Sequence, residues 1–192
     1  MEPRPLTPDD LIEDARRCLN RQSYTPRPPI AGVALSEIAV SRSADGLFSE
    51  IARIDGKDGG LQGHDGFKPV QWNWSLLQPG AVKAWHLHLD QDDLFIVPPD
   101  ATLLVGLADL RHDHQRDAGT RPSPQRFVLG AGRCQRLLIP RGVAHGVANL
   151  GTEPQTILYA VNRFFTADPD RTDEWRLPWD HFGAEFWSMG RG

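Results

Sequence analysis

The chain has 192 residues, a hydrophobic fraction of 40% and a formal net charge of −4. This length suits one domain with a sizeable core. The mild acidity argues against nucleic acid as a partner, because a phosphate backbone is bound by a concentrated basic surface. No apolar stretch approaches the ~18 residues of a membrane-spanning helix, and the N-terminus has no secretory signal pattern. With only Cys18 and Cys134, neither a disulfide framework nor a cysteine zinc site is expected, which indicates a reducing, cytoplasmic location.

The N-terminal segment predicts a short amphipathic helix from Pro8 to Leu19. Thr7 offers a capping hydroxyl, and Pro8 occupies a position where its missing N–H costs nothing. Acidic residues follow at the positive end of the helix dipole, and apolar residues then recur at helical spacing. Residues 1–29 are therefore expected to form an N-terminal helix and a linker.

From Val33 onward the hydrophobic period changes to two, which is typical of β-strands. Sixteen prolines and eighteen glycines punctuate the chain, and the apolar runs between them are short. Many short strands joined by Pro and Gly turns indicate a sandwich or small barrel. The fold class is thus predicted to be mainly β, with the barrel over residues 30–166. The expected strands are VALSEIAV, LFSEIARI, VQWNWSLL, VKAWHLHL, LFIV, TLLVGLADL, RFVLG, CQRLLI, GVAHGVANL and TILYAVNRF.

Residues 167–192 form a segment in which tryptophan and phenylalanine accompany many charges. Such a segment is too aromatic to be a disordered tail. We expect it to pack back on the barrel, with a helical turn or two between Leu177 and Trp187.

The stretch VKAWHLHL places two histidines on one predicted strand. Alternate side chains of a strand point the same way, so His86 and His88 are expected to share a face with Val82 and Ala84. A lone histidine there is most simply a structural residue, but the pair favours a polar cavity lined by imidazoles. The opposite, mostly apolar face is expected to comprise Lys83, Trp85, Leu87 and Leu89.

A third histidine and a tyrosine lie on later strands. In IPRGVAHGVAN, Pro140 and Gly142 form a turn, and His145 follows on a strand from which it can face the same interior. In TILYAVN, Tyr159 is in phase with apolar residues. A tyrosine in that position most often packs in the core with its hydroxyl bonded, so its interpretation depends on its neighbours.

These motifs together resemble the dTDP-4-dehydrorhamnose 3,5-epimerase family of the cupin superfamily. The resemblance rests on the order and spacing of VKAWHLH, LLVGLADLR, LLIPRGVAHGVANL, ILYAVNRFF and DEWRLPWD, with GLFSE and VQWNWS upstream. It extends from about Ile30 to Trp179. It implies a cupin jelly-roll barrel, a homodimer that exchanges N-terminal strands, and a nucleotide-diphospho-sugar substrate in dTDP-rhamnose biosynthesis.

The resemblance also implies a mechanism that requires no metal cofactor. In that family a histidine removes a proton next to the C4 ketone of the sugar, at C3 and C5, and a tyrosine on the other face returns it. His86 matches the base and Tyr159 matches the acid, and their ordinary pKa values of ~6.5 and ~10 suit those roles. The expected substrate-binding residues are Phe48, Glu50, Gln71, Asn73, Lys83, His88 and His145.

Departures from the family pattern leave open a catalytically inactive nucleotide-sugar-binding cupin. Lys83 stands where the family has arginine, which keeps the charge but loses the bidentate fork suited to phosphate. The family's lysine beyond the base has no counterpart, since Asp92, Asp93 and Leu94 occupy that stretch. The aspartate that orients the base in the family is not matched, although Asp180 or another acid could substitute.

A metal-dependent cupin enzyme is a further alternative. In GAVKAWHLHLDQDD a glycine is followed after five residues by His86, then His88 and then Asp92 or Asp93. The stretch PRGVAHGVAN has the proline, glycine, histidine and asparagine spacing of the second metal-cupin motif, with His145 as its ligand. Three histidines and an aspartate could hold a divalent metal with positions left open, although metal cupins normally use glutamate.

Overall fold

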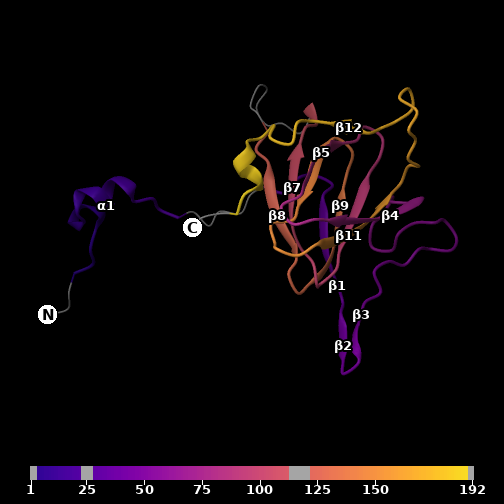
Figure 1. Ribbon diagram of the computed structural model, residues 1–192, viewed down its shortest axis with the longest axis horizontal. Coiled ribbons are helices and arrows are strands. Elements are labelled where there is room, and N and C mark those ends of the chain that lie inside the picture. Colours follow the sequence, from indigo (N-terminus) through magenta and orange to yellow (C-terminus); the bar gives the residue numbers. More distant parts are fainter. Residues whose placement is uncertain (1–3, 23–27, 113–121, 190–192) are drawn as a thin grey trace.

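The computed structural model describes residues 4–22, 28–112 and 122–189. Two five-stranded antiparallel sheets face each other and form the barrel (Figure 1). The first sheet has the strand order β1 (Ala34–Ile38), β9 (Cys134–Ile139), β6 (Asp93–Val97), β11 (Gln155–Val161) and β4 (Gln71–Leu77). The second has the order β12 (Trp175–Arg176), β5 (Val82–Leu87), β10 (Val143–Ala148), β7 (Thr102–Asp109) and β8 (Gln125–Gly130). The chain passes back and forth between the sheets, as in a double-sheet jelly roll, and the prediction of a mainly β barrel is confirmed.

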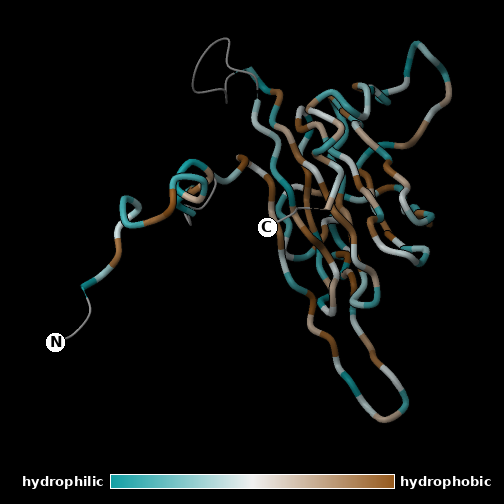
Figure 2. Tube along the Cα trace, turned by 60° about the vertical axis from the view of Figure 1, so that its left-hand side comes forward, coloured by the Kyte–Doolittle hydropathy of each residue, from teal (hydrophilic) through white to brown (hydrophobic). Residues whose placement is uncertain are grey.

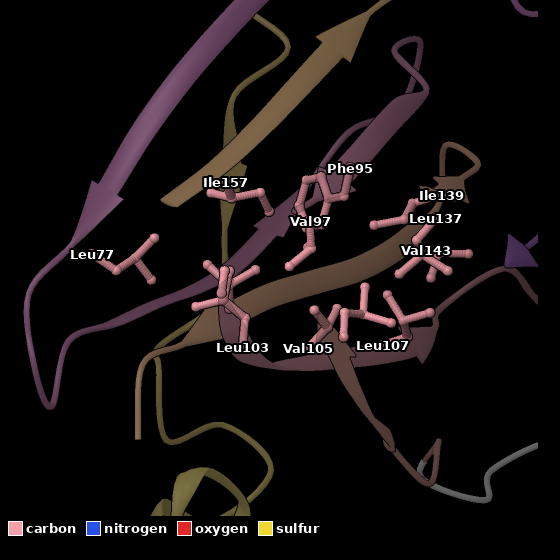
Figure 3. Packing of buried hydrophobic residues seen from close by; sticks show 13 residues of the cluster. Leu77, Phe95, Val97, Leu103, Val105, Leu107, Leu137, Ile139, Val143 and Ile157 are labelled. Carbon is pink, nitrogen blue, oxygen red and sulfur yellow. The ribbon is translucent and has the colours of Figure 1, made fainter. Parts of the chain in front are cut away.

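The core lies between the two sheets. On β7, Leu103, Val105 and Leu107 point inward and are fully buried, because alternate residues of a strand face the same side. Leu104 and Ala108, at the alternate positions, face outward and belong to a second cluster. Figure 3 shows the inward side chains of both sheets pointing toward one another. The labelled members are Leu77, Phe95, Val97, Leu103, Val105, Leu107, Leu137, Ile139, Val143 and Ile157.

The C-terminal segment covers the outside of the second sheet. Its 3₁₀ turn η3 (Ala184–Trp187) buries Phe186 and Trp187 against Trp85 of β5. The indole nitrogens of Trp85 and Trp187 both donate to the carbonyl oxygen of Trp179, at 3.1 and 2.9 Å. The expected packing and helical turn are thus confirmed, whereas the domain boundaries at residues 30 and 167 stay a prediction. We call this packing the outer cluster, which comprises Trp85, Leu104, Ala108, Ala144, Ala148, Phe186 and Trp187.

The N-terminal segment differs from the single helix predicted between Pro8 and Leu19. A 3₁₀ turn η1 (Pro8–Asp10) and a short helix α1 (Glu13–Cys18) are separated by extended residues at Leu11 and Ile12. Neither element buries a residue, and Figures 1 and 2 show them apart from the barrel. A helix this short is marginal in water unless its apolar face packs on something, which explains the interruption.

Two further elements depart from the strand predictions. Of LFSEIARI, only the beginning is a strand, β3 (Gly46–Phe48), which pairs with β2 (Ser41–Ser43) in a projecting hairpin (Figure 1). Beyond it a single bridge joins Ile54 to Leu61. The strand β12 was not predicted, because its two residues carry no periodicity. Within the described part of the chain, no helix is long and apolar enough to cross a membrane.

Candidate active site

A cavity of about 450 Å³ opens where the core between the sheets becomes polar. Its apolar wall includes Phe95, Val147 and Ile157, from three different strands. Its polar lining includes His86, His88, Asp93, His145, Tyr159 and Glu174. The predicted base, the predicted acid and the third histidine therefore share one cavity.

A β-bulge on β5 decides which of its side chains enter this cavity. His145 of β10 is opposite His86, but Val147, two residues later, is opposite Lys83, so three steps on β5 match two on β10. The extra residue reverses the alternation, as a bulge does. Lys83 therefore lines the cavity together with His86, while Val82 and Ala84, predicted to share the face of the histidines, pack against the outer cluster. The prediction that Lys83 lies on the opposite face from the histidines is wrong for this reason.

His86 has an acidic neighbour that sequence reasoning did not identify. Its Nδ1 lies 3.9 Å from Oε2 of Glu174, just before β12, and both side chains are partly buried. Burial lowers the pKa of His86 below its ordinary value, and Glu174 offsets part of that effect. The imidazole is therefore neutral at pH 7 and able to accept a proton. Asp180, the acid suggested from the sequence, is not part of the cavity lining.

This contact yields a prediction that needs no substrate. Changing Glu174 to glutamine is expected to lower the pKa of His86 further, because the carboxylate that favours the imidazolium is removed. An NMR pH titration of the His86 ring measures the shift. Glu153→Gln, at an exposed glutamate outside the cavity, is the matched control and should leave that pKa in place. An unchanged His86 pKa in Glu174→Gln would contradict the contact.

Deeper in the cavity, Asp93 lies between two buried histidines. Its Oδ2 is 3.2 Å from Nε2 of His145 and 3.8 Å from Nε2 of His88, and all three residues are at most 4% exposed. Burial alone would lower the pKa of His145, but the hydrogen bond and charge of Asp93 outweigh it and raise the pKa. Burial alone would likewise raise the pKa of Asp93, and its contact with His145 lowers it instead.

The neighbouring aspartate, Asp92, faces elsewhere. Its carboxylate accepts hydrogen bonds from Arg141 Nη2 at 2.8 Å and from Asn162 Nδ2 at 2.9 Å. It is not part of the cavity lining. Of the two aspartates weighed as metal ligands, only Asp93 therefore joins the histidines.

Asp173 holds the turn that follows β5. Its carboxylate accepts the backbone N–H groups of Leu89, Asp90 and Gln91 at 2.8 to 2.9 Å. Burial would raise the pKa of Asp173, but these N–H groups stabilise the charged form and lower it. The turn brings Gln91 into the cavity, where its amide nitrogen donates to Asp93 Oδ1 at 2.8 Å.

Tyr159 reaches the cavity from β11, in the facing sheet. Its ring lies edge-on to Phe95, with centroids 6.2 Å apart, and Phe95 also contacts the ring of His145. Burial raises the pKa of the Tyr159 phenol above its ordinary value. The phenol is therefore protonated at neutral pH and able to donate its proton.

The residues expected to bind substrate divide into three groups. Lys83, His88 and His145 line the cavity. Gln71 and Asn73 lie on β4 outside the cavity lining, with Asn73 opposite Tyr159, and the Gln71 amide donates to Asn73 Oδ1 at 2.8 Å. The last two, Phe48 and Glu50, lie in or near the projecting hairpin and outside the cavity lining.

Phe48 and Glu50 are therefore not brought together with the histidines within this chain. Phe48 is 68% exposed, and the Glu50 carboxylate pairs with Arg53 at 2.7 Å. Their substrate contacts stay a prediction.

Sequence reasoning missed several residues of the cavity. Gln91 lies between His88 and Asp93 in the sequence, and its position in that motif was a usable signal. Glu174 belongs to DEWRLPWD, which carried part of the family resemblance without a role for its acid. Arg176, in the same stretch, and Phe165, at the end of ILYAVNRFF, also line the cavity, and the resemblance gave no role to either.

No protein-family model matches the chain. The chain is 37% identical over 151 residues to a spore coat polysaccharide biosynthesis protein of Bacillus subtilis, covering 79% of this chain and 91% of the relative. It is 29% identical over 154 residues to a probable low-salt glycan biosynthesis epimerase of Haloferax volcanii, covering 80% and 90%. The same fold occurs in the crystal structure of a dTDP-4-dehydrorhamnose 3,5-epimerase from Bacillus anthracis, which has TDP and pyrophosphate bound. The two structures superpose with a TM-score of 0.61 and 23% sequence identity, covering 83% of this chain and 86% of that chain. The chain therefore belongs to the dTDP-4-dehydrorhamnose 3,5-epimerase family of the cupin superfamily, as a divergent member.

Proposed function

We propose that the protein is an epimerase of a nucleotide-linked 4-keto-6-deoxy sugar in dTDP-rhamnose biosynthesis. Family membership supports the reaction class. The observation that carries the proposal is that His86 and Tyr159 line one cavity, where burial lowers the pKa of the imidazole and raises that of the phenol, which favours a neutral imidazole and a protonated phenol. These are the protonation states that a base and an acid require at neutral pH.

In the proposed reaction His86 removes the proton from a carbon next to the ketone. Glu174 faces Nδ1 of the ring, which leaves Nε2 as the proton acceptor. The electron pair of the broken C–H bond moves onto the ketone oxygen, giving an enolate. Tyr159 then donates its proton to the same carbon from the other face, which inverts that centre. Proton transfer by these two groups does not itself require a metal.

Positive charge in the cavity favours the enolate. Lys83 and Arg176 both line the cavity, and Lys83 Nζ donates to Ser75 Oγ at 2.7 Å. Charges placed before the reaction stabilise a developing oxyanion without the cost of reorganising water. Lys83 thus supports the reaction even though it replaces the family's arginine.

A second recess supports a nucleotide diphosphate as the remainder of the substrate. It has a volume of about 490 Å³ and shares Gln91, Phe165 and Glu174 with the first cavity. Its lining includes Arg163 and Arg171, whose guanidinium groups suit phosphate oxygens. The exposed ring of Phe165 offers a face on which a base can stack.

A homodimer and a cytoplasmic location belong to the same proposal. The edge strand β4 exposes Trp72, Trp74 and Leu76, which a second copy of the chain would cover. Cys18 and Cys134 are both free, as suits a reducing compartment.

The test is hydrogen exchange in deuterated water with a dTDP-linked 4-keto-6-deoxy sugar. We expect solvent deuterium to enter C3, C5 or both. NMR measures the incorporation, which should be well above that of a control without protein. The matched control substrate is dTDP-glucose, which lacks the ketone and should not exchange. Tight binding without exchange would refute the epimerase and identify the inactive binding protein instead.

A further inference from the structure

The buried cluster of His88, Asp93 and His145 has the composition and spacing of a metal site. One ligand atom from each residue lies within 4.8 Å of the other two. The Asp93 oxygen is 3.2 and 3.8 Å from the two imidazole Nε2 atoms. Ligands that are each about 2.1 Å from a shared ion lie about 3.0 to 3.4 Å apart, so small side-chain shifts would bring these atoms to coordinating distance.

Both histidines are already held in the orientation that metal binding needs. His88 Nδ1 lies 2.7 Å from the carbonyl oxygen of Asp173, and His145 Nδ1 lies 3.0 Å from that of Val143. A carbonyl oxygen can only accept, so each Nδ1 carries a hydrogen. Each ring can therefore offer only its Nε2 to a metal, and on His145 the metal would displace the proton that Nε2 shares with Asp93. Metal-ligating histidines typically have such a bond on the other ring nitrogen.

Gln91 gives an independent indication of where the lone pair of His88 Nε2 points. Its amide nitrogen lies 3.3 Å from His88 Nε2 and donates to Asp93 Oδ1 at 2.8 Å. An N–H group, with its partial positive charge, thus bridges the imidazole and the carboxylate. A cation at the other oxygen of Asp93, Oδ2, would likewise lie beside His88 Nε2.

We propose that His88, Asp93 and His145 bind one divalent first-row transition-metal ion. Two imidazoles and one carboxylate are a known ligand set for zinc and for non-haem iron(II), with positions left open. All three side chains line the cavity, which provides an entry path. His86 is outside this set: its ring is stacked on that of His145, with centroids 5.9 Å apart, and its Nδ1 faces Glu174. The inference does not rest on the proposed function.

The test measures metal binding in the absence of any sugar. Protein purified without a histidine tag is stripped with a chelator and titrated with Zn²⁺, and with Co²⁺ as a spectroscopic probe. We expect one ion per chain, a higher melting temperature and visible Co²⁺ absorption. His88→Gln and Asp93→Asn should each weaken binding by more than about 100-fold, since losses of 10- to 100-fold already follow changes in groups that only support the ligands.

His86→Gln is the matched control, because it alters the neighbouring imidazole and leaves the three ligands in place. Its affinity for Zn²⁺ should equal that of the unaltered protein. Loss of binding in His86→Gln, or full binding in Asp93→Asn, would overturn the assignment of ligands. If a variant fails to fold, the unaltered protein still decides: failure to take up one Zn²⁺ or Co²⁺ per chain would overturn the site. None of these results depends on epimerase activity.

Discussion

Replacing His86 by asparagine is expected to slow deuterium exchange next to the sugar ketone by about 10²- to 10⁴-fold, the usual contribution of a positioned base. The variant removes the neutral imidazole that faces Glu174 and leaves a polar side chain of similar reach. Because the half-buried ring belongs to no apolar cluster, the fold should be retained. The measurement is the exchange rate by NMR at saturating dTDP-linked 4-keto-6-deoxy sugar.

His181→Asn is the matched control for this experiment. His181 is exposed in the C-terminal segment and is not part of the cavity lining, so its replacement should leave the exchange rate unchanged. Exchange at the original rate in His86→Asn would show that another group removes the proton.

Replacing Tyr159 by phenylalanine is expected to separate proton removal from inversion. The ring that packs against Phe95 remains, but the proton donor on the far side of the sugar is lost. His86 can still remove the proton and return a deuteron from the same face. Formation of the inverted sugar should therefore fall by about 10²-fold or more, while exchange without inversion continues.

The ratio of exchange to inversion, followed by NMR in deuterated water, measures this separation. His86→Asn provides the comparison, because it should depress both quantities together. If Tyr159→Phe depressed exchange and inversion equally, the phenol would be required for proton removal as well, and its assignment as the acid alone would be wrong.

Hydrophobic alternation predicted most of the barrel and the group at its centre. His86, His145 and Tyr159 lie on three strands whose period placed them toward a common interior, and the structure brings them into one cavity. The face of Lys83 could not be predicted in the same way. A bulge arises where one of two paired strands has an extra residue between matching positions. The sequence of one strand does not show how its residues pair with those of the other strand, so the bulge could not be predicted.

Contacts between distant parts of the chain were also beyond the sequence. Spacing alone allowed either Asp92 or Asp93 to join the histidines, and the choice is made by Arg141, which binds Asp92 outside the cavity. Glu174 meets His86 because β12 pairs with β5, an association between segments almost ninety residues apart. The N-terminal helix is present but shorter than predicted, Glu13–Cys18, because the prediction assumed a packing surface that the described residues do not provide.

In most enzymes the residues that tune a catalytic base also help to stabilise the fold. The short strand β12 separates these two roles. Glu174, the acid beside His86, lies in an exposed segment next to the edge strand β12. His86 lies on β5, directly after Trp85, which is fully buried. Substitution of Glu174 itself can therefore tune the basicity of the imidazole at little cost to the barrel. Divergent members of this family could adjust the pH at which they work by changing the residue at this position alone.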